Sequence, residues 1–324
     1  MSTPTLGIVG LGHVGSAILQ EAVTMGIFGR IVCVDKNEGM ARGDALDNLH
    51  STALSYVSNV DVRAGGYDAL ADADVIIVAA GPSIIPNKND PNGRPDRALL
   101  AGINAKVTNE VVRCIKEYTT DAVVIVATNP VDAMVWVGEN VAQYPEGRLF
   151  GTGTALDSAR LRSIVAKDFD VDPKNVHGYM LGEHGLSAFP VMSRLRVAGL
   201  TIKEAEASFG VHIDEDRIRK EVVDSAYEVL NGKGFTSAGV ARTALMLARA
   251  VLIDERSIYT VSTTLRGEYG YDGDVATSVP SLIGAGGIKK RLEIPLNDLE
   301  KRDLADSVAA VKAAISGARA ALEV

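Results

Sequence analysis

The chain has 324 residues, of which 47% are hydrophobic and 23% charged, a composition typical of globular proteins. That length suits about two domains of ordinary size. The composition excludes a disordered chain, a collagen-like fibre and a cysteine-stapled secreted module. The formal net charge of −8 argues against a nucleic-acid-binding protein, which needs a basic surface. An anionic ligand would therefore need a locally positive pocket.

The amino-terminal segment has no basic stretch followed by a long apolar run, so we expect no secretory leader. The longest apolar runs, such as residues 75–80 and 122–127, are far too short to span a bilayer. They suit strands of a parallel sheet that are buried on both faces. We therefore expect a cytoplasmic protein with no membrane segment.

The first half of the chain alternates short apolar runs with helical patterns. The strand-like runs lie at residues 6–10, 31–35, 74–80 and 123–128, and the helical patterns lie between them at residues 14–25, 38–49 and 96–117. Strands that alternate with helices predict βαβ units with right-handed crossovers. The sequence thus predicts an α/β fold with a doubly wound parallel sheet.

The second half has a different order of elements. Helical patterns are expected at residues 154–169, 214–230 and 237–250, paired strands at 187–202, one strand at 258–265, and a long helix at the carboxyl end. This order predicts an α+β domain over residues 151–324. No linker rich in proline or serine separates the halves, so we expect them to share a packed interface.

A glycine motif follows the first strand-like run. Gly10, Gly12 and Gly15 have the spacing GxGxxG and open a helical pattern, and Asp35 ends the second run 20 residues after Gly15. The glycines allow a tight turn, a close approach of a diphosphate and close helix–strand packing, and the helix N-terminus offers N–H groups to phosphates. Asp35 would bond the ribose hydroxyls of NAD and repel the 2′-phosphate of NADP. The motif predicts a Rossmann-type NAD-binding domain over residues 1–150.

Four further motifs occur later in the chain. They are TNPVD at residues 128–132, GTGTALDSAR at 151–160, GEHG at 182–185 and NGKGFT at 231–236. Together with the glycine motif and Asp35, they closely resemble the L-lactate/L-malate dehydrogenase superfamily over nearly the whole chain. Within it, the chain is most similar to the L-2-hydroxyisocaproate dehydrogenases and the L-lactate dehydrogenases. The resemblance implies an oxidoreductase that uses NAD and a small 2-oxo or 2-hydroxy acid.

The resemblance also implies roles for four residues. His184 matches the catalytic acid/base, Asp157 its carboxylate partner, Arg160 the residue that binds the substrate carboxylate, and Arg97 the residue that polarises the substrate carbonyl. These residue types suit the chemistry. Reduction of a 2-oxo acid needs a proton donor near neutral pH, which an imidazole provides. A guanidinium binds a carboxylate through two parallel N–H bonds, so the arginines would form the positive pocket.

Three more residues are implied near the cofactor and the substrate. Asn129 matches a hydrogen-bonding residue beside the nicotinamide, Thr152 a residue near its carboxamide, and Thr236 a wall of the substrate pocket. No metal site is expected. The NAD- and metal-dependent glycosidases share the fold, but they would carry a cysteine near the Asn-Pro segment, where Thr128 stands here.

The identity of the substrate depends on the long loop at residues 81–97. Ile84 or Ile85 falls where the family selects its substrate, and an apolar side chain there offers no partner to a second carboxylate. The sequence therefore favours a 2-oxo acid with a branched or bulky apolar side chain. An L-lactate dehydrogenase acting on pyruvate is the alternative, and a malate dehydrogenase is the least favoured.

Arg162 and His177 raise the question of regulation. They match positions that bind fructose 1,6-bisphosphate in allosteric bacterial L-lactate dehydrogenases, and two cationic donors could hold a phosphate. The alternative is that Arg162 pairs with a local acid and His177 has a purely structural place at a strand. The resemblance also implies a homotetramer or a homodimer.

Overall fold

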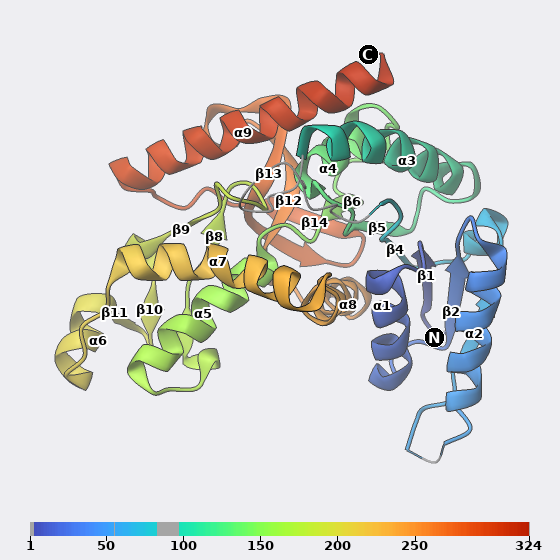
Figure 1. The fold of residues 1–324 in the computed structure, drawn as a ribbon, viewed down its shortest axis with the longest axis horizontal. Coiled ribbons are helices and arrows are strands. Elements are labelled where there is room, and N and C mark those ends of the chain that lie inside the picture. Colours follow the sequence, from blue (N-terminus) through green and yellow to red (C-terminus); the bar gives the residue numbers. More distant parts are fainter. Residues whose placement is uncertain (1–2, 55, 83–96, 324) are drawn as a thin grey trace.

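The computed structural model describes residues 3–54, 56–82 and 97–323. The first half alternates strands and helices (Figure 1). Its elements are β1 (Thr5–Val9), α1 (His13–Met25), β2 (Arg30–Val34), α2 (Glu38–Ser51), β3 (Asp61–Ala64), β4 (Val75–Val78), α3 (Arg97–Tyr118), β5 (Val123–Val126), α4 (Val131–Asn140) and β6 (Leu149–Gly151). Strands β1, β4 and β5 are buried along their whole length, as strands covered by helices on both faces must be.

The second half begins with a helix and small strands. Its elements are α5 (Ala155–Phe169), β7 (Val176–His177), β8 (Met180–Leu181), β9 (Phe189–Pro190), β10 (Arg196–Val197), β11 (Leu200–Thr201), α6 (Ile202–Phe209), α7 (Glu215–Lys233), α8 (Ala238–Leu252), β12 (Ser257–Arg266), β13 (Asp272–Gly284), β14 (Gly287–Arg291) and α9 (Asp298–Leu322). Strands β7, β10 and β11 form a three-stranded sheet, and β8 pairs with β9.

One nine-stranded sheet runs through both halves, in the order β14-β13-β12-β6-β5-β4-β1-β2-β3. The six strands from β6 to β3 are parallel neighbours, and their order is that of a dinucleotide-binding Rossmann sheet. The second half adds three antiparallel strands at the β6 edge, where Ser262 of β12 pairs with Gly151. From β1 the strand order continues outward in one direction through β2 and β3, and from β4 in the opposite direction through β5 and β6. In sheets of this kind, ligands bind in the crevice between the two strands where the direction changes, here β1 and β4.

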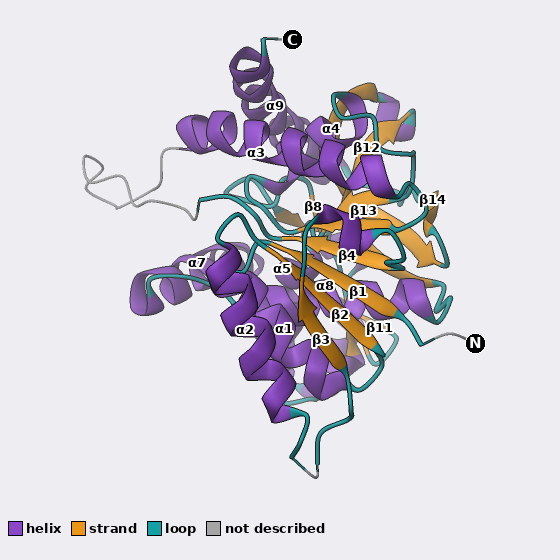
Figure 2. Ribbon diagram, turned by 90° about the vertical axis from the view of Figure 1, so that its right-hand side faces the viewer, coloured by secondary structure: helices purple, strands orange, loops and turns teal. Residues whose placement is uncertain are grey.

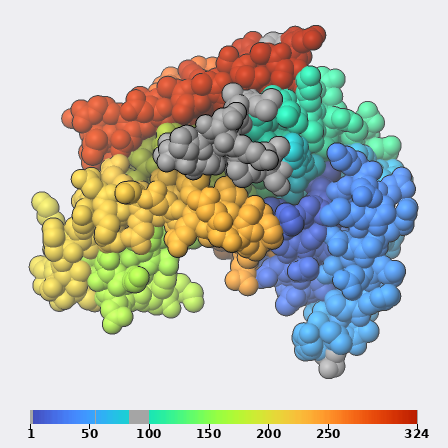
Figure 3. Space-filling model, viewed as in Figure 1, coloured from blue at the N-terminus to red at the C-terminus, as the bar shows by residue number. Residues whose placement is uncertain are grey.

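Helices cover both faces of the sheet (Figure 2). One core lies between the sheet and α3, α4 and α9, and the other lies between the sheet and α1 and α8. A third core holds α5 and α7 against the small sheet. In Figure 3, α9 forms the upper edge of the molecule, and α7 lies below α9 on the side that faces the viewer. Each of the two larger cores takes side chains from both halves of the chain.

The predicted fold class is confirmed, a Rossmann-type parallel sheet followed by an α+β part. Six strands of the described part of the chain were not predicted, namely β3, β6, β7, β8, β13 and β14. The paired strands expected at residues 187–202 form three strands of two residues each. In β13, Pro280 cannot donate a ladder hydrogen bond, which weakens the strand pattern of that segment. Within the described residues, no helix is both long and apolar enough to cross a membrane.

Candidate active site

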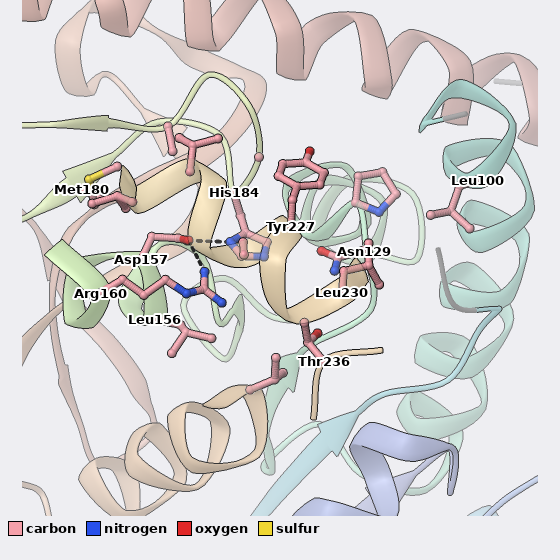
Figure 4. A pocket seen from close by; sticks show the side chains of 17 residues that line it. Leu100, Asn129, Leu156, Asp157, Arg160, Met180, His184, Tyr227, Leu230 and Thr236 are labelled. Atoms are coloured by element: carbon pink, nitrogen blue, oxygen red, sulfur yellow. Dashed lines mark hydrogen bonds and ion pairs between the residues drawn. The ribbon is translucent and has the colours of Figure 1, made fainter. Parts of the chain in front are cut away.

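A single pocket brings together five of the residues that the sequence singled out (Figure 4). They come from four places in the chain: Asn129 before α4, Asp157 and Arg160 in α5, His184 in the loop after β8, and Thr236 before α8. The remaining lining is largely apolar. The pocket therefore combines one cluster of ionisable side chains with an apolar wall.

The cluster is built around Asp157. His184 Nδ1 donates to Asp157 Oδ2 at 2.7 Å, and Arg160 donates to Asp157 Oδ1 at 2.6 Å. All three side chains face the pocket and are largely buried, with His184 the most exposed at 23%. Because the carboxylate holds Nδ1, the other ring nitrogen of His184 is left to a ligand in the pocket (Figure 4).

Local structure explains why these groups meet. Asp157 lies in the first turn of α5, where a helix favours an acid, and Arg160 follows at i+3 on the same face. Gly182 turns the chain before His184 with a φ of +88°, and a Cβ there would lie 2.2 Å from Ser307 Oγ. The loop thus approaches α9 closely at a position that only glycine fits.

The surroundings of Asp157 and His184 favour the charged form of both side chains. Burial opposes ionisation of Asp157, but the neighbouring His184 and Arg160 outweigh it and lower the pKa of that carboxyl. Burial would likewise lower the pKa of His184, but the Asp157 carboxylate outweighs it, so the pKa of the imidazole is raised. The site holds an imidazole that keeps its proton to a higher pH than a free one does.

Asn129 lines the pocket and is held in place by its neighbours. Its peptide bond to Pro130 is cis, and its carbonyl oxygen accepts a hydrogen bond from Asn104 Nδ2 at 2.6 Å. The hydroxyl of Thr128 donates to the carbonyl oxygen of Ala80 at 2.7 Å. The segment before α4 is therefore tied to the end of β4 and to α3, close to the point where the winding of the sheet reverses.

The glycine motif forms the turn between β1 and α1. Gly10 has a φ of +95°, and a Cβ at Gly15 would lie 1.8 Å from the carbonyl oxygen of Gly10. A Cβ at Gly12, the N-cap of α1, would meet no atom within 4 Å, so the turn is open on that side. Asp35 stands beside it, where its carboxylate accepts from the backbone of Leu11 at 2.7 Å. This arrangement fits the diphosphate and ribose of a dinucleotide.

The apolar wall of the pocket is a feature that the sequence analysis missed. Most of it comes from one face of α7, with contributions from α3, α5 and α8; its side chains are Leu100, Leu156, Val222, Val223, Ala226, Tyr227, Leu230 and Val240. The spacing of three and four along α7 could have indicated this face. Val229 on the same helix does not line the pocket and is 45% exposed.

Four other predicted site residues are not seen in the pocket, one because it lies elsewhere and three because they or their side chains are outside the described residues. Thr152 is buried between β6 and α5 and does not line the pocket. Ile84 and Ile85 lie outside the described residues, and α3 begins at Arg97, whose side chain is also outside them. Among the described residues, no group of three or more histidine, cysteine or acidic side chains is arranged to hold a metal ion.

Arg162 and His177 are not linked to each other by a hydrogen bond in the part of the chain that the structure describes. Arg162 is half-buried on α5, and His177 is exposed on β7, opposite Arg196 in the small sheet. The predicted alternative, an ion pair of Arg162 with a local acid, does not occur among the described side chains.

Comparison with protein families gives two matches that cover almost the whole chain. Residues 5–151 match the NAD-binding domain of the lactate/malate dehydrogenases, and residues 154–321 match their α/β C-terminal domain. The predicted NAD cofactor is thereby confirmed.

Individual relatives agree with these matches. The chain is 45% identical to L-lactate dehydrogenase 2 of Clostridium acetobutylicum over 314 residues, which is 96% of each chain. It is 37% identical to the L-lactate dehydrogenase of Selenomonas ruminantium, again over 96% of each chain. Among solved structures, the minor L-lactate dehydrogenase of Enterococcus mundtii superposes with a TM-score of 0.89 at 32% identity, covering 97% of this chain and 98% of that one.

Proposed function

Because the chain belongs to the lactate/malate dehydrogenase family, we propose that it catalyses the reversible reduction of pyruvate to L-lactate with NADH. The observation that carries this proposal is the pocket in which His184, paired with Asp157, and Arg160 face the same space as Asn129. The relatives named L-lactate dehydrogenase support pyruvate over other 2-oxo acids.

The roles of the residues follow from their chemistry. Arg160 binds the carboxylate of the 2-oxo acid through the N–H groups that Asp157 leaves available. When bound, NADH supplies the hydride that adds to C2. His184 donates its proton to the oxygen on which negative charge develops, and Asp157 stabilises the charged imidazole before that transfer. The products are the 2-hydroxy acid and NAD⁺, and the neutral His184 then takes a proton from solvent.

The cofactor side is assigned in the same way. Gly10, Gly12 and Gly15 form the turn that receives the diphosphate, and Asp35 binds the adenosine ribose. Asn129, which lines the pocket, is assigned to the nicotinamide side, and the family membership supports the same assignment for Thr152 and that of Arg97 to the substrate carbonyl. Thr236 borders the substrate.

A second candidate is a 2-oxo acid with a branched or bulky apolar side chain. The observation that favours it is the apolar face of α7, because Ala226 and Leu230 line the pocket with no polar group to bind a second carboxylate. Arg160 and His184 are the cationic side chains of the described lining, and both have roles in the reaction proposed above. Oxaloacetate therefore has no dedicated partner among these lining residues.

Steady-state oxidation of NADH with pyruvate, 2-oxoisocaproate, phenylpyruvate and oxaloacetate tests both candidates. We expect the highest kcat/KM with pyruvate. A higher value with 2-oxoisocaproate or phenylpyruvate would replace pyruvate by the bulkier class. The absence of turnover with all four, in protein that binds NADH, would overturn the proposal.

A parallel series with fructose 1,6-bisphosphate tests Arg162 and His177 as an effector site. The homodimer or homotetramer stays a prediction.

A further inference from the structure

A second buried carboxylate contacts the residue proposed to carry the proton. Asp132 lies in the first turn of α4 and is only 3% exposed. Its Oδ2 accepts a hydrogen bond from the backbone N–H of His184 at 2.8 Å, and its Oδ1 accepts from Ser262 Oγ at 2.6 Å. A buried carboxylate is costly unless such donors satisfy it, so its place in the core calls for a reason.

The position of Asp132 links the two sides of the pocket. It follows Asn129, which lines the pocket, by three residues in the same short segment. Its two partners lie far along the chain, His184 in the loop after β8 and Ser262 in β12. One carboxylate therefore fixes the main chain of His184 relative to the segment that holds Asn129.

His184 is thus held by two different acids. Asp157 orients the imidazole through Nδ1, whereas Asp132 holds the backbone nitrogen of the same residue. The charged groups that face Asp132 are His184 and Glu183, and those that face His184 are Asp157, Arg160 and Asp132. Burial raises the pKa of Asp132 to about 7, against the bonds from Ser262 and the His184 backbone, so the carboxylate is mostly ionised only above that pH.

We propose that Asp132 is a positioning residue for the reaction: it holds the His184 loop against α4 and β12, and its negative charge helps the imidazole to keep its proton. This inference rests on the proposed function, because it assumes that His184 is the proton donor. It goes beyond that function in assigning a part to a residue that lies behind the pocket and does not line it.

The variant Asp132→Asn separates charge from shape. An amide of the same shape still accepts from the His184 N–H and donates to Ser262 Oγ, but it carries no charge. We expect the fall in kcat/KM for pyruvate reduction to move to a pH roughly one unit lower than in the wild type. Above the wild-type pKa of His184, this shift corresponds to roughly a tenfold loss of kcat/KM. The Kd of NADH and the KM of pyruvate at low pH should change little, because Asp132 lines neither ligand's space.

Glu139→Gln is the matched control. Glu139 is also buried on α4, two turns after Asp132, and accepts from the backbone of Thr264 in β12 at 2.9 Å. It does not contact His184, so its variant should lower stability without moving the pH profile. If both variants move the profile equally, the effect of Asp132 is a general one on folding, and the proposal is overturned.

Ser262→Ala keeps the test decisive if Asp132→Asn does not fold. Loss of one hydrogen bond destabilises the ionised carboxylate, so we expect a smaller shift of the profile in the same direction. An unshifted profile in the variants that fold would overturn the proposal. His184→Ala separates it from the proposed function: if that variant keeps wild-type turnover, His184 is not the proton donor, and the fault lies with the function rather than with Asp132.

Discussion

The ion pair of Asp157 and His184 sets the pH range in which the imidazole carries a proton. Burial works against the charged ring, and the Asp157 carboxylate outweighs it, so the pKa of His184 is raised. Reduction of a 2-oxo acid consumes that proton. We therefore expect kcat/KM for reduction to be level below the pKa of His184 and to fall as the pH rises through it. Oxidation of the 2-hydroxy acid needs the neutral ring and should depend on pH in the opposite sense.

Asp157→Asn tests this directly. Removing the charge next to the ring should lower the pKa of His184 by roughly one to three units, so the fall in kcat/KM for reduction moves to lower pH by that amount. The measurement is a pH–rate profile from about pH 5 to pH 9, the range in which histidines titrate. Asp168→Asn is the control, because Asp168 lies on the same helix and pairs with Arg217 instead. Profiles that coincide for Asp157→Asn and the wild type would exclude this role.

Single residues differ in how far the sequence reveals them. His184, Asp157 and Arg160 could be placed because each lies in a motif with fixed spacing, and the structure brings the three together. Asp132 lies in such a motif too, but an acid in the first turn of a helix already has an ordinary explanation in the helix dipole. Its hydrogen-bond partners are 52 and 130 residues away, and the local sequence does not predict contacts at that separation.

At the scale of elements, we expect α7 to limit the size of the substrate, because its side chains form most of the apolar wall of the pocket. Ala226 is a small side chain in the face that lines the pocket, so Ala226→Phe should fill space that a bulky substrate needs. We expect kcat/KM for 2-oxoisocaproate to fall at least about tenfold more than that for pyruvate, the order of effect of a lost methylene site. Val229→Phe is the control on the same helix, because Val229 is exposed. Equal losses on both substrates would show that α7 does not select by size.

The elements were predictable to different degrees for a physical reason. Buried parallel strands such as β4 and β5 are short unbroken apolar runs, which the sequence displays directly. The 13 residues of β13 contain Ser, Thr, Gly and Pro280 among the apolar residues, so no clear period marks them as a strand. Strand β13 is held in the sheet by its pairing with β12 over nine residue pairs. The composition of the segment does not indicate this pairing.

At the scale of the whole molecule, one sheet runs through both of the domains that the sequence predicts. The predicted division into residues 1–150 and 151–324 stays a prediction, and it falls where β6 ends. Strand β12 of the second half pairs with β6, and helix α8 of the second half packs in the same core as α1. The two halves therefore share their apolar cores, so we expect neither half to be stable without the other.

Thermal unfolding tests that expectation. Chains of this length commonly unfold in several steps, because separate domains melt independently. Here Trp136, the single tryptophan, donates from α4 to the carbonyl oxygen of Gly273 in β13 and so reports on contact between the halves. We expect tryptophan fluorescence and far-ultraviolet circular dichroism to give one coincident transition at a fixed protein concentration. A circular dichroism transition that leaves the fluorescence unchanged would show that one part of the chain unfolds while the joint between α4 and β13 stays intact, and the shared cores would then not couple the halves.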